Sequence, residues 1–369
     1  MIGNIITNSN LPLSKRLRRL SSFGIESYKV NSSWKKRFKA ICEQNSGYLL
    51  PGKESTEKKH NAIWCGFRRR VNLNTFRVCK NISGVENEHI IPEDIFTIDI
   101  EPTLNPHPAL KFYEIKNLYN AWFSKKIFPQ DFLHIMDGEL FDGNLNNLDR
   151  KDLDHVVSHF PYPVVMKPSI YSYGGRDVFF IQNSRELLEK IEGRKNVVVQ
   201  ECIQQHPFFA RFNGKGINTV RVYFYKSVKD NKIHFLHAAL RMGVGGSLDN
   251  LTDGGIVSYI NESGYLHGYA LDKYGGKFDK HPDSNLSFDE KIPDFEQMKI
   301  LAVHIAKQVY FGRLVSMDLC YDDQANWRVI EVGTFGHTIR FAQYAGQPFF
   351  GEFTEEVIDY CLKNHWALK

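Results

Sequence analysis

Short apolar runs separated by polar or glycine-containing turns recur through the second half of this 369-residue chain. Short runs of this kind, bounded by turns, are typical of buried strands. The pattern therefore predicts strands at residues 163–168, 177–181, 196–203, 219–226, 233–241, 315–320 and 329–333.

Longer segments with apolar residues at helical spacing predict helices. They cover residues 110–125, 295–311 and 353–363. Prolines punctuate residues 91–108, which predicts an extended chain there. Residues 1–95 are predicted to be mostly helical with some strand.

Two carboxylates stand in the last pair of predicted strands. Asp318 lies in residues 315–320 and Glu331 in residues 329–333, with a polar turn between the runs. This arrangement predicts a hairpin with the two side chains on facing strands. A carboxylate in an apolar run is costly to bury unless a positive group neutralises it, and Mg²⁺ prefers such oxygen ligands. Two exposed carboxylates on a solvent-facing side are an equally weighted alternative.

A second motif lies upstream, where the apolar strand 163–168 ends at Lys167 and Pro168. A loop with Ser169, Gly174 and Gly175 follows, and then another strand. A strand, a small-residue turn and a strand form a flap whose backbone N–H groups can cover phosphates, while a lysine reaches them as a point charge. An ordinary hairpin with a solvent-seeking lysine is the alternative.

A third motif is the apolar run 197–199, which opens into Gln200, Glu201, Cys202 and Ile203. Such a segment can lay its backbone along the edge of an adenine while a side chain meets the ribose. A plain strand end is the alternative.

The order of these motifs resembles the ATP-grasp superfamily, and more narrowly the sugar-transfer-associated ATP-grasp proteins of polysaccharide biosynthesis. The resemblance covers roughly residues 98–336. It rests on the lysine strand, the glycine loop, the Gln-Glu edge and the late Asp and Glu. Further elements are Ile-Glu-Pro-x-Leu-Asn at 100–105, Lys-Asn-Leu-Tyr at 116–119, Asn-Thr-Val-Arg at 218–221 and Arg-Met-Gly at 241–243 running to Asp249 and Asn250.

The resemblance implies an α+β ATP-grasp fold, in which two lobes clamp a nucleotide, with an additional basic N-terminal domain. The expected domains are residues 1–95 for the basic domain and 96–126 for a linker with the first nucleotide-contacting helix. Residues 127–203 are expected to form the small, flap-bearing lobe, and residues 204–369 the large lobe with the metal site.

The resemblance also implies roles for single residues, with ATP and Mg²⁺ as cofactors. Phosphate contacts fall to Lys116 and Lys167, and closure over the phosphates to the loop from Ser169 through Gly174 and Gly175. Adenine contacts fall to Gln200, Glu201 and Ile203. Neutralisation of the transferred phosphoryl group falls to Arg221 and Arg241. Magnesium binding falls to Asp318 and Glu331. Apart from the resemblance, the glycine-rich loop after Arg241 can present Asn250 to the acyl or nucleophile site, with tight turns between strands as the alternative.

One position departs from the family pattern. Proteins of this kind usually carry an asparagine two residues after the metal-bridging glutamate, and this chain has Gly333 there. A third metal ligand is then missing unless Thr334 or His337 takes its place, or water does.

Composition narrows the class of protein. No stretch approaches the ~20 apolar residues of a membrane-spanning helix, and the first 20 residues lack the apolar core of a signal peptide. The six cysteines are scattered without a C-x-x-C pair, which argues against a disulfide framework or a zinc knuckle. We therefore expect a cytoplasmic protein, with the inner membrane surface as a further location.

Charge is concentrated at the N-terminus. Residues 1–80 hold 17 Lys and Arg against 4 Asp and Glu, whereas the whole chain has a net charge of +5. Such a region attracts polyanions. An anionic glycan or a lipid-diphosphate carrier is the expected partner, with RNA less favoured, and a solvated helix surface is an equal alternative.

These observations favour an ATP-dependent ligase that joins a carboxylate to an amine through an acyl phosphate. By resemblance, its substrates are small carboxylates and amines or a sugar-polymer precursor that receives an amino acid. Two alternatives stay open: a phosphotransferase that uses the same nucleotide cradle, and a non-catalytic polyanion-binding protein.

Overall fold

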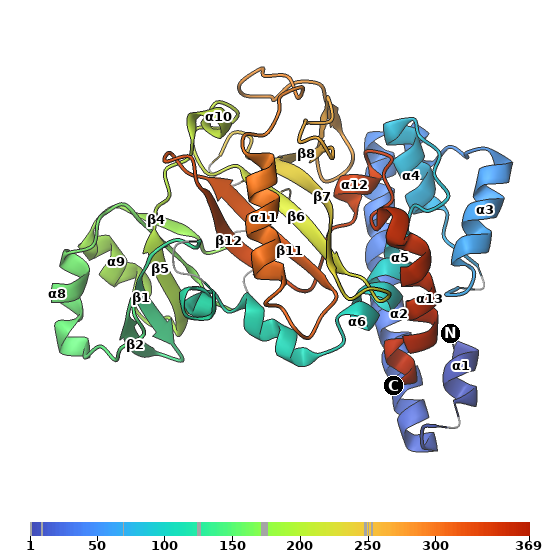
Figure 1. Cartoon of the computed structure of the whole chain (residues 1–369), viewed down its shortest axis with the longest axis horizontal. Coiled ribbons are helices and arrows are strands. Elements are labelled where there is room, and N and C mark those ends of the chain that lie inside the picture. The colour runs from blue at the N-terminus through green and yellow to red at the C-terminus, as the bar shows by residue number, and fades with distance from the viewer. Residues whose placement is uncertain are drawn as a thin grey trace.

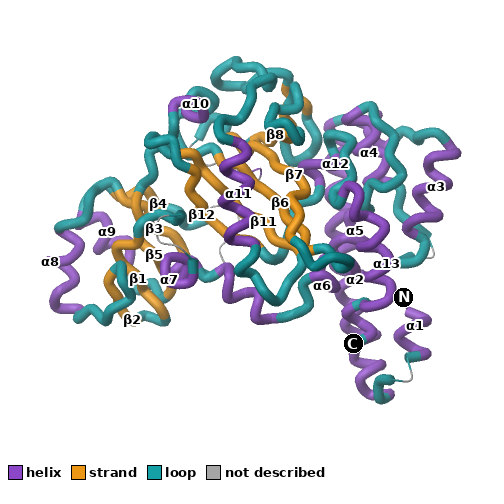
Figure 2. The backbone as a smooth tube through the Cα atoms, in the orientation of Figure 1, coloured by secondary structure: helices purple, strands orange, loops and turns teal. Residues whose placement is uncertain are grey.

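The computed structural model describes residues 2–8, 10–68, 70–123, 127–170, 176–246, 249, 251 and 254–369. In Figure 1, two sheet-containing lobes stand side by side, and a group of helices packs against the far end of the larger lobe. The N-terminal helices and the C-terminal helix belong to this group, so both ends of the chain lie there. Figure 2 shows the strands confined to the two lobes and the helical group set apart.

The smaller lobe is built on a five-stranded antiparallel sheet with the order β2-β1-β5-β3-β4. Met166 and Val199 point into an apolar core that α8 and α9 complete. Because strand residues alternate between faces, Lys167 and Gln200 point to the opposite face. The elements are β1 (Asp131–Met136), β2 (Glu139–Asp142), η5 (Arg150–Asp152), α8 (Leu153–Ser158), β3 (Val164–Pro168), β4 (Phe179–Ile181), α9 (Ser184–Ile191) and β5 (Asn196–Glu201).

The larger lobe is built on a seven-stranded antiparallel sheet with the order β10-β9-β8-β7-β6-β11-β12. The helix α11 covers one face of this sheet (Figure 1). The elements are α10 (Pro207–Ala210), β6 (Thr219–Lys226), β7 (Ile233–Met242), β8 (Ile256–Ile260), β9 (Ala270–Leu271), β10 (Lys277–Phe278), α11 (Phe295–Ala306), β11 (Leu314–Tyr321) and β12 (Trp327–Gly333).

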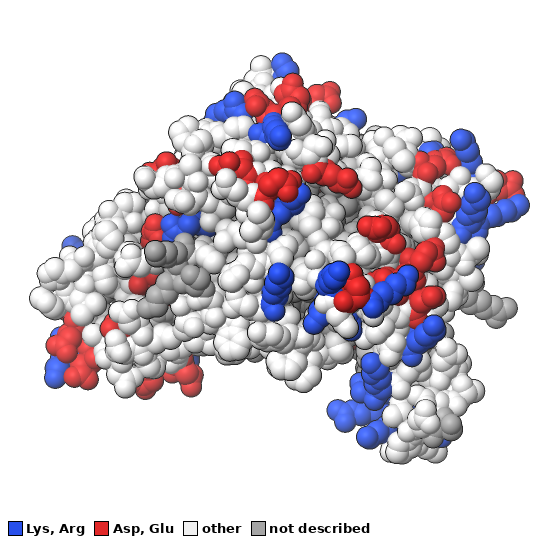
Figure 3. Space-filling view, viewed as in Figure 1, with Lys and Arg blue, Asp and Glu red and all other residues white. Residues whose placement is uncertain are grey.

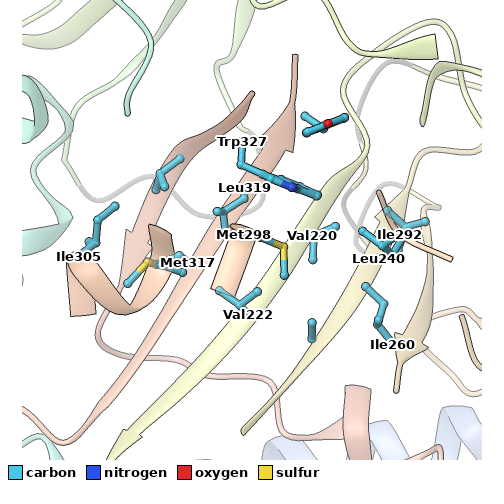
Figure 4. Close-up of a cluster of buried hydrophobic side chains, with 14 of the residues drawn as sticks. Val220, Val222, Leu240, Ile260, Ile292, Met298, Ile305, Met317, Leu319 and Trp327 are labelled. Carbon is cyan, nitrogen blue, oxygen red and sulfur yellow. The ribbon is translucent and has the colours of Figure 1, made fainter. Parts of the chain in front are cut away.

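The core under α11 fixes which side chains face the other way. Figure 4 shows Val220 and Val222 of β6 with Met317 and Leu319 of β11, facing Met298 of α11. The residues between them in sequence must therefore lie on the opposite face of the sheet. That face is divided: Tyr223 and Tyr225 pack against the helical group, and Arg221 and Asp318 form part of a polar cluster.

The N-terminal helices share their apolar cores with the larger lobe. Within the described part of the chain, Trp64 clusters with Tyr223, and Phe38 clusters with Leu271. The helical group comprises α1 (Ile2–Thr7), α2 (Leu13–Gln44), η1 (Ser46–Leu49), α3 (Glu54–Trp64), α4 (Asn74–Ser83), α12 (Arg340–Gln343), η7 (Gly351–Phe353), α13 (Thr354–Asn364) and η8 (Trp366–Leu368).

All seven predicted strands are confirmed, as are the helices predicted at 295–311 and 353–363. The prediction of some strand in residues 1–95 is wrong for the described residues of that region, which form helices and connecting turns. The predicted domain boundaries stay a prediction. Among the described residues, the basic region has no apolar core of its own, because its buried side chains cluster with those of later segments.

The prediction of an extended chain at 91–108 is also wrong. This segment forms α5 (Glu93–Ile95), η2 (Phe96–Ile100), which is a π-turn, and α6 (Glu101–Leu104). Ile91, Ile95, Ile100 and Leu104 are buried together, at steps of four, five and four residues. The π-turn accommodates the step of five residues, and the prolines stand at helix starts, where they are tolerated.

The single helix predicted at 110–125 is broken into η3 (Pro108–Glu114), η4 (Lys116–Leu118) and α7 (Tyr119–Trp122). The break comes at Ile115, whose backbone is extended. It lets the Lys116 N–H donate to the Ser169 carbonyl at 2.9 Å, which ties the segment to the smaller lobe. Among the described residues, no helix combines the length and the apolar character needed to cross a bilayer.

Candidate functional site

Three polar side chains form a row across the central strands of the larger lobe. Arg221 of β6 stands opposite Asp318 of β11, and Asp318 stands opposite Glu331 of β12. Directly paired residues of neighbouring strands point to the same face, which here is the face away from α11. Arg241 of β7 joins the row from the next strand, two residues beyond Ala239, the partner of Arg221.

Asp318 is held by two arginines. The Arg221 Nε and Nη2 each donate to it at 2.6 Å, and the Arg241 Nη1 donates at 2.7 Å. Burial opposes the charge of Asp318, but the two guanidinium groups outweigh it and hold the pKa of this carboxyl well below its usual range. The carboxylate is thus ionised and fixed in place across the whole physiological pH range.

A third carboxylate, Asp249, lies next to Arg241. Asp249 accepts a hydrogen bond from the Arg241 Nη2 at 3.3 Å and another from the Thr219 hydroxyl. Burial raises the pKa of Asp249 in spite of the neighbouring arginine. The arginine at the deep end of the row is therefore shared between two carboxylates.

The other end of the row faces the smaller lobe. The Lys116 Nζ donates to the Glu331 carboxylate at 2.8 Å. Lys167 is buried close by, and burial together with the charge of Lys116 lowers its pKa to about 8, against a smaller opposing effect of Glu331. The lysine-bearing strand of one lobe and the carboxylate hairpin of the other therefore meet.

The assembled charges suit an anionic ligand. Four cationic side chains and three carboxylates lie in one cluster, so the cluster is short of negative charge when all are ionised. The two lysines repel each other, and a bound anion would compensate both charges. The planar guanidinium group of arginine also matches the geometry of phosphate oxygens. The cluster consists of Lys116, Lys167, Arg221, Arg241, Asp249, Asp318 and Glu331.

The carboxylate pair fits a magnesium ion. Asp318 and Glu331 are cross-strand partners with hard oxygen donors, and the Glu331 side chain is 35% exposed, which leaves one side open to an ion and to phosphate. Each carboxylate oxygen that accepts one hydrogen bond keeps a further lone pair for a metal. The two residues named for the metal are thus brought together.

The missing third ligand has a structural cause. A Cβ at Gly333 would lie 2.7 Å from the Ser316 Oγ on the facing strand, so an asparagine there would displace that hydroxyl. Both predicted substitutes bond other residues, but the His337 Nε2 has no hydrogen bond among the described residues, so a third ligand from this pair stays a prediction. Thr334 donates from both its backbone and its hydroxyl to Glu114, and the His337 ring bonds Glu101 at 2.6 Å.

The predicted adenine edge has a structural role as well. The Gln200 Nε2 donates to Asp131 at 2.6 Å, and Glu201 accepts from Arg328 at 2.9 Å. Arg328 lies on β12, so the pair Glu201–Arg328 ties the two lobes. Ile203 is buried. The adenine contacts of Gln200, Glu201 and Ile203 stay a prediction.

Three predicted site residues, Gly174, Gly175 and Asn250, lie outside the described residues. Ser169 is described: its carbonyl accepts from the Lys116 N–H, and its hydroxyl is buried without a hydrogen bond among the described residues. It is therefore placed beside both lysines of the site.

Sequence reasoning missed a buried polar group in the smaller lobe. Asp131 accepts from the Asn120 and Gln200 side-chain amides, and the Asn117 amide bonds the His134 ring. The signal was present: Asp131 and His134 interrupt an otherwise apolar strand, and polar residues in such runs need partners. Burial raises the pKa of Asp131.

A family match covers most of this chain. The family described as sugar-transfer associated ATP-grasp matches residues 98–355, which confirms the resemblance and the expected fold. A comparison with curated proteins found no match.

Solved structures are similar at a lower level. The biotin carboxylase domain of the Hydrogenobacter thermophilus 2-oxoglutarate carboxylase aligns at 13% identity and a TM-score of 0.41, over 68% of this chain and 45% of that one. The Staphylococcus aureus N5-carboxyaminoimidazole synthetase complexed with ADP aligns at 12% and 0.38, over 64% and 50%. The ATP-grasp ligase PsnB aligns at 15% and 0.40, over 70% and 62%. This chain thus spans about half the length of the first two structures.

Proposed function

Because this chain belongs to the sugar-transfer associated ATP-grasp family, we propose that it is an ATP-dependent ligase that joins a carboxylate to an amine. One observation carries the proposal: Lys116 bonds the carboxylate Glu331 and Lys167 is buried near both, in a row that continues through Asp318 to two arginines. Such a row offers cations for a polyphosphate and carboxylates for its metal within one cluster.

The proposed chemistry has two steps. A carboxylate oxygen of the first substrate attacks the γ-phosphorus of ATP, the bond to the β-phosphate oxygen breaks, and ADP leaves. The amine nitrogen of the second substrate then attacks the acyl carbon, the carbon–oxygen bond to the phosphoryl group breaks, and inorganic phosphate leaves. The amine loses a proton, and an amide remains.

The residues of the row supply charge and position for both steps. Lys116 and Lys167 hold the phosphate oxygens, and Arg221 and Arg241 neutralise the negative charge on the group in transfer. Asp318 and Glu331 would hold a magnesium ion, which would supply Lewis-acid neutralisation of phosphate oxygens. Since Asp318 already fixes both guanidinium groups, the row is ordered before the substrate arrives.

The smaller lobe serves as the cover. Its strand β3 brings Lys167 against the row, and the loop that includes Ser169, Gly174 and Gly175 is proposed to close over the phosphates. Closure keeps water from hydrolysing the acyl phosphate. Gln200, Glu201 and Ile203 are proposed to border the adenine, and Asn250 the acceptor.

The family description supports a proposal for the substrate class. A family associated with sugar transfer fits a carboxylate carried by a sugar, so we propose a carboxyl-bearing sugar, or a precursor of a sugar polymer, as the acceptor of an amino acid or amine. The six cysteines show no disulfide, which suits the cytoplasm as the proposed location.

The test combines binding with product analysis. ATP, Mg²⁺ and pairs drawn from uronic acids and amino acids are supplied, and products are followed by ³¹P NMR. The proposal expects ADP and free phosphate only when both substrates are present. A phosphorylated acceptor would instead identify a phosphotransferase, and the absence of ADP formation together with no stabilisation by Mg²⁺ and ADP would refute both.

A matched pair of variants links the result to the site. Lys167→Met is expected to weaken nucleotide binding by about 2 kcal/mol, because the buried cation is lost. Lys151→Met removes an exposed lysine of the same lobe and is expected to leave binding unchanged. Equal binding by both variants would show that nucleotide lies elsewhere.

A further inference from the structure

The first helices of the chain project from the molecule as a tip, defined here as residues 3–28. In Figure 1, α2 extends beyond the body at its N-terminal end and α1 folds back beside it. The Arg16 guanidinium donates to the Ile6 carbonyl at 2.7 Å, and the Asn8 amide donates to the Leu368 carbonyl at 2.9 Å. The tip is therefore held in a defined position by the rest of the fold.

One side of the tip is anchored. Phe23 is buried with Ile5, Ile98 and Ala367, and Leu20 packs against the same cluster. The Arg68 guanidinium lies 5.4 Å from the centre of the Phe23 ring. This side of α2 has its apolar contacts satisfied within the molecule.

Another side of the same helix exposes apolar residues to solvent. Leu13 is 64% exposed, Leu17 58%, Ile25 52% and Tyr28 77%. Their spacings of four, eight and three residues place them on one face of the helix, as a stripe several turns long. A stripe of large exposed side chains on a well-anchored helix marks an interaction surface.

The charge around the stripe is mostly positive. Residues 3–28 contain four Lys and Arg and one acidic residue, Glu26, which pairs with Lys29. Lys15 and Arg18 are exposed, and Figure 3 shows Lys and Arg side chains gathered where the tip projects. A partner that covers this surface must therefore combine negative charge with apolar matter.

We propose that the tip docks on the surface of an anionic lipid bilayer. The stripe would insert among the upper acyl chains, while Lys15, Arg18 and Arg19 bind the headgroups, as in interfacial amphipathic helices. A second copy of the tip carries the same positive charge and would repel it. RNA or an acidic glycan matches the charge but leaves the aliphatic stripe uncovered. This inference goes beyond the proposed ligase activity and does not depend on it.

Vesicle flotation of the full chain tests the proposal. Vesicles of phosphatidylcholine with 30% phosphatidylglycerol are compared with pure phosphatidylcholine, at low and at high salt. We expect binding to the anionic vesicles at least about ten-fold above the neutral ones, and a loss of most of it at high salt, since each basic residue near a charged surface adds about five-fold.

Two pairs of variants separate the stripe from the charge. Leu13→Ser with Leu17→Ser is expected to lower anionic-vesicle binding about ten-fold or more. Lys15→Gln with Arg18→Gln is expected to do the same. The matched controls are Lys35→Gln with Lys36→Gln, which removes two exposed charges of α2 nearer the body, and Ile300→Ser, which removes a 72% exposed apolar side chain of α11.

Several outcomes would overturn the proposal. These are equal binding to neutral and anionic vesicles, no binding to either, or unchanged binding by the leucine variant. If the Lys35 and Lys36 control lost more vesicle binding than the Lys15 and Arg18 variant, the binding would reflect the overall positive charge and not the tip. Dimerisation in solution that the leucine substitutions abolish would assign the stripe to a second copy. Circular dichroism checks that each variant keeps its helix content.

Discussion

The two carboxylates of the site share a register position but differ in how they are held. The Asp318 side chain is 7% exposed and accepts hydrogen bonds from two arginines. The Glu331 side chain is 35% exposed and accepts a hydrogen bond from Lys116 alone among the described residues. A buried, doubly compensated carboxylate is a fixed part of the framework. A half-open one can exchange its partner for a metal ion. One strand pair thus provides both an anchor and an adjustable ligand.

The cations differ in the same way. Arg221 and Arg241 lie against a carboxylate, and the electrostatic attraction of Asp318 raises the pKa of Arg221 despite burial. Lys167 is buried with its pKa lowered, and among the described residues no carboxylate lies within ion-pair distance of its Nζ. The positive charges of the two arginines are therefore compensated within the protein. The positive charge of Lys167 would be compensated by a bound anion.

Asp318→Asn gives the largest expected effect. It leaves two buried guanidinium groups short of a counter-charge, although Asp249 still accepts a hydrogen bond from Arg241. The free energy of unfolding should fall by about 3–5 kcal/mol. Glu331→Gln is the control and should cost less, about 1–2 kcal/mol, because its amide oxygen can still accept from the Lys116 Nζ and the side chain at 331 is partly exposed. Urea denaturation measures both, and equal losses would remove the distinction between the two carboxylates.

Lys167→Met gives the second effect, which should appear in binding and not in stability. The affinity for Mg²⁺ and ADP should fall by about 2 kcal/mol, the value of a charge-assisted hydrogen bond. The free energy of unfolding should stay constant or rise, since a buried cation with a lowered pKa opposes folding. Calorimetry and denaturation together test this. A loss of stability as large as that of Asp318→Asn would place Lys167 with the framework.

The pH dependence of nucleotide binding is the third effect. Free Lys167 has a pKa of about 8, so it loses its proton as the pH rises through 8, well before an ordinary lysine. Affinity for ADP should therefore decline above pH 8 and level off near the affinity of Lys167→Met. Binding near pH 8 should take up a proton, which calorimetry in buffers of different ionisation enthalpy detects. Lys167→Met should show neither, and an unchanged affinity up to pH 10 contradicts the assignment.

The lowered pKa of Lys167 also determines how the free energy of unfolding changes with pH. The unfolded chain keeps the ordinary lysine pKa, so between about pH 8 and pH 10.5 it binds more protons than the folded chain does. The contribution of Lys167 to the free energy of unfolding therefore increases with pH across this window. The slope should be smaller in Lys167→Met.

Gly333→Ala gives the smallest effect. The added Cβ meets the Ser316 Oγ at 2.7 Å, which should cost about 1 kcal/mol of stability. Ser316→Ala in the same chain removes that oxygen and should restore most of the loss. Thermal unfolding of the single and double variants measures the coupling. If the stability losses of the two single variants simply add in the double variant, the contact with Ser316 is not what excludes a side chain at position 333.

Much of the site could be predicted from alternation along strands. Arg221 and Asp318 each stand between apolar residues that face α11, so their common face followed once the strands were known. The hairpin also followed from two apolar runs and a polar turn. Pairing between β6 and β11 brings together residues almost a hundred positions apart, and no local pattern specifies that neighbour.

Two helical segments show where local patterns fail. Residues 110–125 have helical spacing, yet the helix breaks at Ile115 because Lys116 bonds Ser169 and the Tyr119 hydroxyl bonds the Val332 backbone. Prolines in 91–108 favoured an extended chain, yet burial of Ile95 and Ile100 against the larger lobe made it helical. In both cases long-range contacts outweighed local preference.

The sequence by itself determined the strands, the α+β class, the motif order that marks the family and the residue types of the site, because periodicity and residue chemistry are local properties. Only the tertiary structure decided that Asp318 is an anchor and Glu331 an adjustable ligand, that Gln200 and Glu201 hold neighbouring residues, and that α2 carries an uncovered apolar stripe. Those properties depend on which atoms exclude water and which charges lie within a few ångströms, and these follow from packing between distant parts of the chain.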